Sequence, residues 1–156
     1  MKKGDVMASE RMIFVNLPVS DLAASRRFLE SIGAVNEPKF SDETAAMMRF
    51  SEAINVMLLT KEKFAGFTPR EIADANKASE VLIALSAESR DAVDRSIDAA
   101  VRAGGTADPG PKQDYGVMYG RSVADPDGHI WEFVWMDVSA AEQGASAIDA
   151  NVPQEA

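Results

Sequence analysis

The sequence predicts an α+β fold built from two βαβββ modules whose mixed sheets form a cup. Three observations support this prediction. The order strand, helix and three further strands occurs twice, with the two copies offset by roughly 70 residues. Each predicted helix ends at glycine, at Gly33 and at Gly104-Gly105. One module of this size would leave a face of its sheet exposed, so two modules are expected to pair, within the chain or across a homodimer.

Composition excludes several classes of partner. The 156-residue chain has 16 Lys and Arg against 25 Asp and Glu, a net charge of −9, so nucleic acid and anionic membranes would be repelled. The chain contains no cysteine, which excludes disulfides and thiolate metal sites. No apolar run reaches the roughly 18 residues that a membrane span needs, and no targeting segment is recognisable. We therefore expect a cytoplasmic protein that binds neither nucleic acid nor membrane.

The first module is predicted over residues 11–60, after an N-terminal extension of residues 1–10. Met12 to Val19 alternates between an apolar and a mixed face, as a strand does. Ser20 is a candidate cap for a helix with Asp21 in its first turn, which ends at Gly33. Three strands of a meander should follow, over residues 34–38, 44–50 and 53–60.

A charged connector is predicted over residues 61–79. Its segment Thr68-Pro69-Arg70-Glu71 has the form of a capping box with proline at the first helical position. We expect a short helix there.

The second module, over residues 80–137, repeats the first. A strand is predicted over residues 80–86, and Ser89 should cap a helix with Val93, Ile97 and Val101 on one face. Further strands are expected over residues 106–109, 116–124 and 130–136. Residues 138–156 contain few large apolar side chains and predict a tail that is flexible or docks weakly on a partner.

Three stretches resemble the glyoxalase, bleomycin-resistance protein and extradiol-dioxygenase superfamily, which has the vicinal-oxygen-chelate fold. They are residues 14–22 (FVNLPVSDL), Ala103-Gly104-Gly105, and residues 125–132 (DPDGHIWE). The last is the most specific, because a tight turn leads into a strand with an acidic residue four positions after the glycine. The resemblance runs from about Arg11 to Met136.

The resemblance implies a place for a divalent ion, held by four side chains from four strands. Carried onto this chain, those positions are Phe14, Met57, Leu82 and Glu132, of which only Glu132 is a suitable ligand. Such an ion needs several oxygen or nitrogen donors. A shift of the alignment by a few residues would bring in only amides, at Asn16, Asn55 or Asn76. We therefore predict no metal cofactor, with one divalent ion at Glu132 as the alternative.

A cavity follows from the alternation of side chains in the strands. If the turn at residues 125–128 pairs Ala124 with His129, Arg121 lies opposite Glu132 and Tyr119 opposite Val134, all on one face. Trp131, Phe133 and Trp135 would then pack on helices. The predicted ligand-binding residues are Phe14, Asn16, Asn55, Met57, Leu82, Tyr119, Arg121 and Glu132.

Two interpretations of Arg121 and Glu132 remain open. The pair could simply neutralise each other beside a filled core. Alternatively, Glu132 acts as a general base or anchors a cation while Arg121 binds an oxyanion. His129, the single histidine, lies in the turn, where a solvated side chain is expected.

Three functions are compatible with these residues. The first is a metal-free protein that binds a small aromatic or cationic molecule, as bleomycin-resistance proteins sequester a ligand. The second is a metal-dependent glyoxalase-like lyase or dioxygenase-like enzyme. The third is a metal-independent isomerase that uses Glu132 as its catalytic residue. Whether the protein is an enzyme does not follow from the residues alone, because this fold hosts many functions.

Overall fold

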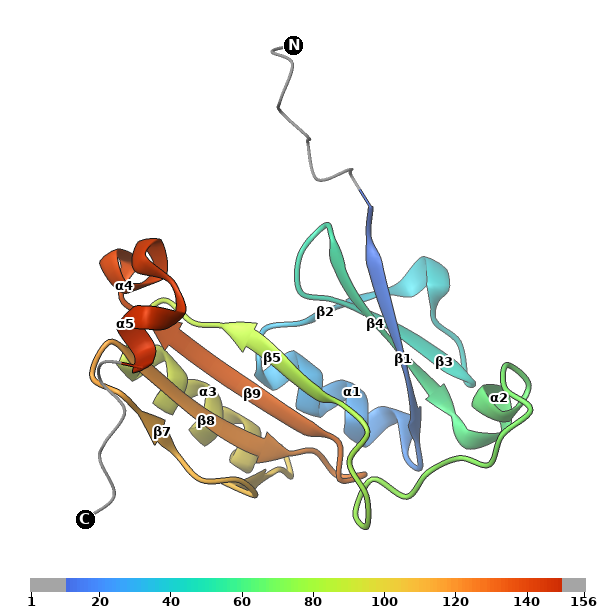
Figure 1. The fold of residues 1–156 in the computed structure, drawn as a ribbon. Coiled ribbons are helices and arrows are strands. Elements are labelled where there is room, and N and C mark those ends of the chain that lie inside the picture. Colours follow the sequence, from blue (N-terminus) through green and yellow to red (C-terminus); the bar gives the residue numbers. More distant parts are fainter. Residues whose placement is uncertain (1–10, 150–156) are drawn as a thin grey trace. The chain divides into compact units, whose positions relative to one another are not determined.

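The computed structural model describes residues 11–149 and has the predicted α+β architecture with two mixed sheets (Figure 1). The chain divides into two compact units between Ile72 and Ala73. Each unit contains one sheet with a long helix packed on it. The predicted N-terminal extension and the last residues of the predicted tail, 150–156, lie outside the described residues.

The first unit contains a four-stranded sheet in the order β1-β4-β3-β2. Strand β1 runs parallel to β4, and the other neighbours are antiparallel. The elements agree with the predicted strand, helix and meander: β1 (Ile13–Val19), α1 (Leu22–Ser31), β2 (Val35–Glu37), β3 (Ala45–Arg49) and β4 (Ile54–Thr60).

Helix α1 covers one face of this sheet. Its N-cap is Asp21, whose carboxylate accepts the Ala24 N–H at 3.0 Å, and not the predicted Ser20. Gly33 follows the helix at a φ of +105°, as the predicted helix end requires. The core consists of the fully buried side chains that α1 and the covered face of the sheet share: Phe28, Leu29, Val19, Met48, Val56 and Leu58.

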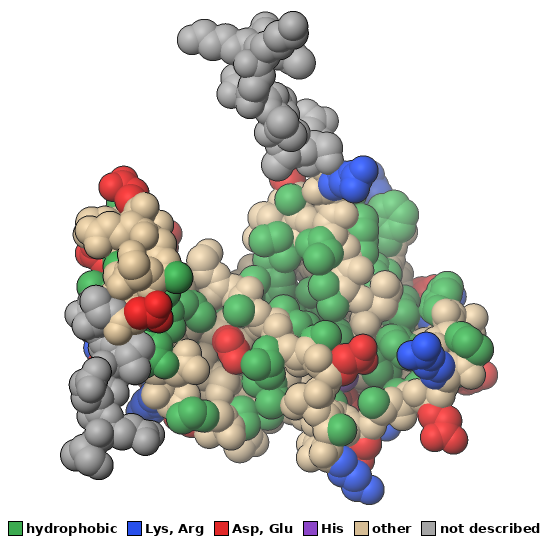
Figure 2. Space-filling model, in the orientation of Figure 1, with side chains coloured by type: hydrophobic (Ala, Val, Ile, Leu, Met, Phe, Trp, Pro, Cys, Tyr) green, Lys and Arg blue, Asp and Glu red, His purple; other side chains and the backbone are tan. Residues whose placement is uncertain are grey.

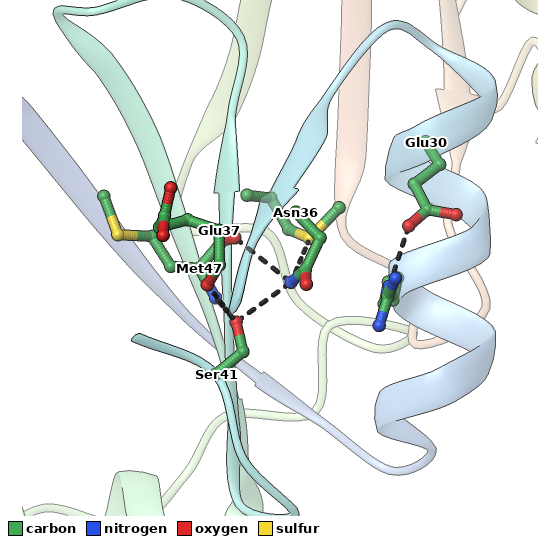
Figure 3. Close-up of polar contacts among 7 residues, drawn as sticks. Glu30, Asn36, Glu37, Ser41 and Met47 are labelled. Carbon is green, nitrogen blue, oxygen red and sulfur yellow. Dashed lines mark hydrogen bonds and ion pairs between the residues drawn. The ribbon is translucent and has the colours of Figure 1, made fainter. Parts of the chain in front are cut away.

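A polar cluster fixes the connection between β2 and β3, which contains the short 3-10 helix η1 (Pro38–Phe40). The Ser41 hydroxyl donates to the Glu37 carbonyl at 2.7 Å and accepts the Met47 N–H at 3.1 Å. It also accepts the side-chain amide of Asn36 at 2.9 Å (Figure 3). These bonds stabilise the short strand β2 against β3.

The connector helix forms at a different place from the one predicted. Helix α2 (Lys61–Ala65) follows β4 directly, and Thr60 caps it by accepting the Lys63 N–H at 3.2 Å. Thr68 instead accepts the N–H of Arg70, two residues on, which forms a local turn in place of the predicted capping box. The prediction over residues 68–71 was therefore wrong.

The second unit repeats this strand order, as β5-β9-β8-β6, with β7 also paired to β8. Strand β5 is parallel to β9, as β1 is to β4. Strand β7 was not predicted. The bounds are β5 (Leu82–Ser86), α3 (Arg90–Arg102), β6 (Thr106–Ala107), β7 (Gln113–Asp114), β8 (Met118–Ala124) and β9 (Ile130–Met136).

Helix α3 packs on β8, β9 and β6. The Ser89 hydroxyl accepts the Ala92 N–H at 3.0 Å, which confirms the predicted cap. Of the three residues predicted to share one face, Val93 and Ile97 are buried, whereas Val101 is 43% exposed and Ala100 is buried instead. The helix therefore presents a slightly rotated face to the sheet.

Part of the predicted tail is helical. Helices α4 (Val138–Gln143) and α5 (Ala145–Asp149) pack on each other, and Ala140 and Ala147 are buried. Across residues 11–149, no helix is long and apolar enough to cross a membrane.

Candidate ligand-binding site on the second sheet

The turn between β8 and β9 sets the register of the site. Gly128 donates its N–H to the Asp125 carbonyl at 3.0 Å, and Asp125 donates its own to the His129 carbonyl at 2.9 Å. Gly128 has a φ of +91°. This is a three-residue hairpin loop, a type I turn followed by a left-handed glycine. Asp125, rather than Ala124, therefore pairs with His129.

This turn moves the register by one residue from the predicted one. Ser122 lies opposite Glu132, and Arg121 lies opposite Phe133. Tyr119 lies opposite Trp135 instead of Val134. Because side chains alternate along a strand, a shift of one residue transfers Arg121 and Tyr119 to the opposite face of the sheet. The predicted pairing of Arg121 with Glu132 is wrong.

The face beneath α3 carries the aromatic residues. Trp131 is fully buried and Phe133 is 3% exposed, which confirms that these side chains pack against the helix. The Trp131 indole donates to the Asp125 carboxylate at 3.3 Å, and that carboxylate also accepts the N–H of His129 at 3.0 Å. Burial raises the pKa of Asp125, while its charge interaction with His129 opposes the shift. The Asp125 carboxylate and the main chain of His129 therefore stabilise the turn.

Arg121 and Tyr119 are bonded to aspartates on this α3 face. Arg121 binds the Asp108 carboxylate through two nitrogens, at 3.0 and 2.7 Å, and Asp94 on α3 at 2.9 Å. The Tyr119 hydroxyl donates to Asp94 at 2.7 Å. The hydroxyl, with a further contribution from Arg121, lowers the pKa of Asp94. Arg121 likewise lowers the pKa of Asp108. The guanidinium is therefore already neutralised.

Glu132 lies on the other, open face, which borders a cavity of about 230 Å³. Leu82, Ile130 and Val134 provide apolar lining, and Ser122 lies beside Glu132. The segment between β6 and β7 forms a wall through Pro109, Gly110, Pro111 and Gln113. In Figure 2, which views the side of this sheet opposite α3, hydrophobic and uncharged side chains predominate over β5 and β9.

The Glu132 carboxylate is half-buried in this lining. Among residues 11–149, no side chain forms an ion pair with it and no group donates a hydrogen bond to it. A carboxylate in apolar surroundings is stabilised by a cation or a hydrogen-bond donor. The cavity therefore presents an acceptor to any ligand that supplies one.

Four of the predicted ligand-binding residues lie together on the first sheet. Phe14 is opposite Asn55, and Asn16 is opposite Met57, so all four share the face turned away from α1, as predicted. Asn55 is fully buried and donates to the Ile13 carbonyl at 3.3 Å. In the described part of the chain its Oδ1 has no hydrogen-bond partner. Phe14 is 43% exposed.

The strand registers test whether a metal ion fits. Phe14 lies opposite Asn55, which is two positions before Met57 on β4. In the same way, Leu82 lies opposite Ile130, which is two positions before Glu132 on β9. The two pairs are thus equivalent positions of a repeated unit. A phenyl ring, a thioether and an aliphatic side chain fill three of the four positions, and these are not ligands for a hard divalent ion.

The amides considered as substitutes do not complete the set. Asn76 is in the connector, where it donates to the Asp127 carbonyl at 3.2 Å. Within residues 11–149 no three His, Cys, Asp or Glu side chains gather as a metal site. The residues present do not fit the ion that the resemblance implies.

Ser122 and the wall over residues 109–113 were missed in the sequence. Ser122 was hidden by the error in register, which assigned it to the aromatic face. The dipeptides of Pro109-Gly110-Pro111 were a usable signal of a rigid loop, but nothing in them indicated a cavity.

Comparisons with known proteins agree with this architecture. The sequence model of the Glyoxalase/Bleomycin resistance protein/Dioxygenase superfamily matches residues 11–133. No curated protein sequence matches the chain.

Several solved structures are similar in fold. Hypothetical protein SA1046 from S. aureus has a TM-score of 0.67 at 22% identity, over 79% of this chain and 91% of that one. A glyoxalase-related enzyme from Fulvimarina pelagi has a TM-score of 0.67 at 22% identity, over 80% and 87%. The fosfomycin resistance protein FosX from Mesorhizobium Loti has a TM-score of 0.58 at 18% identity, over 82% and 93%. With the family match extending over most of its length, the chain belongs to the glyoxalase/bleomycin resistance protein/dioxygenase superfamily.

Proposed function

We propose that this protein binds a small organic cation, without a metal ion, in the cavity on the open face of the second sheet. Glu132 anchors the cationic or hydrogen-bond-donating end of the ligand, and the apolar lining receives its hydrocarbon part. The observation that carries the proposal is the Glu132 carboxylate, which lacks an ion-pair partner within residues 11–149 while it borders an apolar cavity. Most small-molecule sites combine such a lining with a few polar groups.

The distribution of charge supports a cationic ligand. Residues 73–149 contain 14 Asp and Glu against 6 Lys and Arg, whereas residues 11–72 contain 8 of each. A negative field of this kind raises the local concentration of cations. Arg121 is among the residues that line the cavity, but Asp94 and Asp108 already neutralise its guanidinium.

Anchoring is better supported than catalysis. A general base would need a second group to receive or deliver a proton on the substrate. Apart from Glu132, the residues with polar side chains that line the cavity are Gln113, Arg121 and Ser122, and none of these side chains readily exchanges a proton near neutral pH. The two enzymatic alternatives, a metal-dependent lyase or dioxygenase and a metal-independent isomerase, have no comparable observation in their favour.

The proposal is tested by thermal denaturation with three probes of similar shape: benzamidinium, benzoate and benzyl alcohol, each in the presence of a chelator. Benzamidinium should raise the unfolding midpoint in a concentration-dependent way, because a ligand that binds only the folded state stabilises it. Benzoate should have no effect.

Glu132→Gln should weaken benzamidinium binding by about tenfold or more. The matched control is Glu88→Gln, which makes the same charge change at an exposed position of the same unit. Equal stabilisation by benzoate, or equal losses in the two variants, would refute the proposal.

A further inference from the structure

The wall of the Glu132 cavity is held at both ends by arginine–aspartate pairs, and one of these arginines, Arg121, is itself among the residues that line the cavity. Residues 109–113 form this wall, with Asp108 before it and Asp114 after it. Arg121 binds Asp108, and Arg90 on α3 forms an ion pair with Asp114. We call these two Arg–Asp pairs the wall clamp.

The geometry of the Arg121–Asp108 pair fixes the position of Asp108. Both nitrogens of its planar fork bind the Asp108 carboxylate, and its side chain is only 12% exposed. Bidentate guanidinium–carboxylate pairs fix orientation as well as distance. The third bond, from Arg121 to Asp94 at 2.9 Å, ties the pair to helix α3.

Asp108 marks the point where the chain crosses the edge of the sheet. Its carboxylate is on the α3 side with Arg121, whereas the next residue, Pro109, lines the cavity. Asp108 has a φ of +53°, in the left-handed region that few residues other than glycine, asparagine and aspartate adopt. Such a conformation persists where surrounding contacts impose it, and the Arg121 pair is such a contact.

Main-chain bonds then transmit this position to the wall. Asp108 donates its N–H to the Ser122 carbonyl at 2.8 Å, and Gly110 donates to the Ser122 hydroxyl at 3.2 Å. Ser122 lies directly opposite Glu132. The wall is thus attached to the residue next to the proposed anchor.

The other end of the wall is held in a more exposed way. Besides its ion pair with Asp114, Arg90 stacks over the Tyr119 ring, 4.6 Å from the centroid, and donates to the Gly116 carbonyl at 3.4 Å. Solvent-exposed pairs contribute less than buried ones. The Arg121 end should therefore dominate.

We infer that Arg121 is a positioning residue for ligand binding: from the far face of the sheet it holds the wall over residues 109–113 at a fixed distance from Glu132. The inference rests on the proposed function. Arg121 borders the cavity, but Asp108 and Asp94 bind its guanidinium, so it acts through Asp108 and not in the oxyanion-binding role that its sequence position predicts.

The experiment combines two measurements on the full chain. Hydrogen exchange of the amides of residues 108–114 reports on the wall, and calorimetric titration with benzamidinium reports on the cavity. In Arg121→Met, both measurements should change by about tenfold, towards faster exchange and weaker binding. Arg121→Lys retains the charge but not the planar fork, so it should recover part of each change.

A destabilised control separates this role from a general loss of stability. Ile97→Val shortens a buried side chain of α3 that is not part of the wall clamp. It should lower the unfolding midpoint and leave wall exchange and probe affinity at their wild-type values. If Ile97→Val reproduced the Arg121→Met changes, or if Arg121→Met changed neither measurement, the inference would be wrong.

The two proposals can fail separately. If the wild type does not bind benzamidinium, the proposed function fails, while the exchange of residues 108–114 still decides whether Arg121 holds the wall. If the wild type binds and Arg121→Met retains full affinity, the positioning role fails and the proposed function stands.

Discussion

Ser122 lies directly opposite Glu132 across strands β8 and β9, and the two side chains share the open face of the second sheet. Counting along the ladder from the Asp125–His129 hydrogen bond, Ser122 and Glu132 form a non-hydrogen-bonded pair, the kind with the shorter separation between side chains. This relationship leaves Glu132 without the arginine that a register shifted by one residue would place there.

Cross-linking tests the register directly, because the chain has no cysteine of its own. The double substitution Ser122→Cys with Glu132→Cys should oxidise readily to an intramolecular disulfide, detected by intact mass and thiol titration. Arg121→Cys with Glu132→Cys should remain reduced under the same conditions, since those positions are on opposite faces. A disulfide in the second variant and none in the first would mean that the register is wrong.

Substitution of Gly128 tests the three-residue turn. An added Cβ would lie 2.5 Å from the Asn76 side-chain oxygen and 2.8 Å from the Asn76 backbone nitrogen, at a φ of +91°. We expect Gly128→Ala to lower the free energy of unfolding by about 2–4 kcal/mol, measured by urea denaturation.

Gly33→Ala is the control for Gly128→Ala, because Gly33 also has a positive φ but no atom within 4 Å of the added Cβ. It should cost only about 1 kcal/mol, from backbone strain alone. Equal losses in the two variants would contradict the packing of the connector against the turn.

The Asp108–Arg121 pair should make stability fall in acid. Because Arg121 lowers the pKa of Asp108 in the folded state, the stabilisation is present above the unfolded value of 3.8 and is lost as the pH falls through the folded pKa. Asp108→Asn should therefore cost about 1–2 kcal/mol near neutral pH.

The same variant should show a shallower loss of stability between about pH 5 and pH 2. The measurement is the free energy of unfolding from urea titrations across that range. Parallel pH profiles for the wild type and Asp108→Asn would show that this carboxylate carries no folded-state charge interaction.

Metal loading tests whether the cavity lacks the ligands that a divalent ion needs. After dialysis against a chelator and incubation with Zn²⁺, Ni²⁺, Fe²⁺ or Mn²⁺, elemental analysis should find far less than one ion per chain. Phe14, Met57 and Leu82 offer no suitable donor, and a single carboxylate binds such ions weakly. Stoichiometric metal that disappears in Glu132→Gln would favour the lyase or dioxygenase alternative.

Much of the fold could be predicted because its signals are local. The alternation in β1, the helix period of α3 and the glycines at both helix ends each depend on neighbouring residues. The repeated order of elements added a constraint that one module alone would not provide. The superfamily was predicted from three stretches, of which residues 125–132 were the most specific, in agreement with the match over residues 11–133.

The site could be predicted only in part because its register depends on one dihedral angle. Asp125-Pro126-Asp127-Gly128 was taken as a loop of four residues, but the left-handed Gly128 makes it a loop of three. A change of one residue reverses which side chains face the cavity. Glu132 was placed correctly relative to Trp131 because both are on one strand, whereas Arg121 was placed on the wrong side.

The Asp108–Arg121 pair was not predicted either. The two residues are 13 positions apart, and their contact depends on where the irregular segment after β6 crosses the sheet edge. Neither hydrophobic periodicity nor turn composition specifies that path.

The most direct test of the central claim is a crystal structure of the protein grown with benzamidinium in metal-free buffer. We predict density for the amidinium within hydrogen-bonding distance of the Glu132 carboxylate, with the ring against Leu82, Ile130 and Val134, and Arg121 still bound to Asp108. A cavity that contains a metal ion held by several protein atoms, or an amidinium bound away from Glu132, would contradict the account.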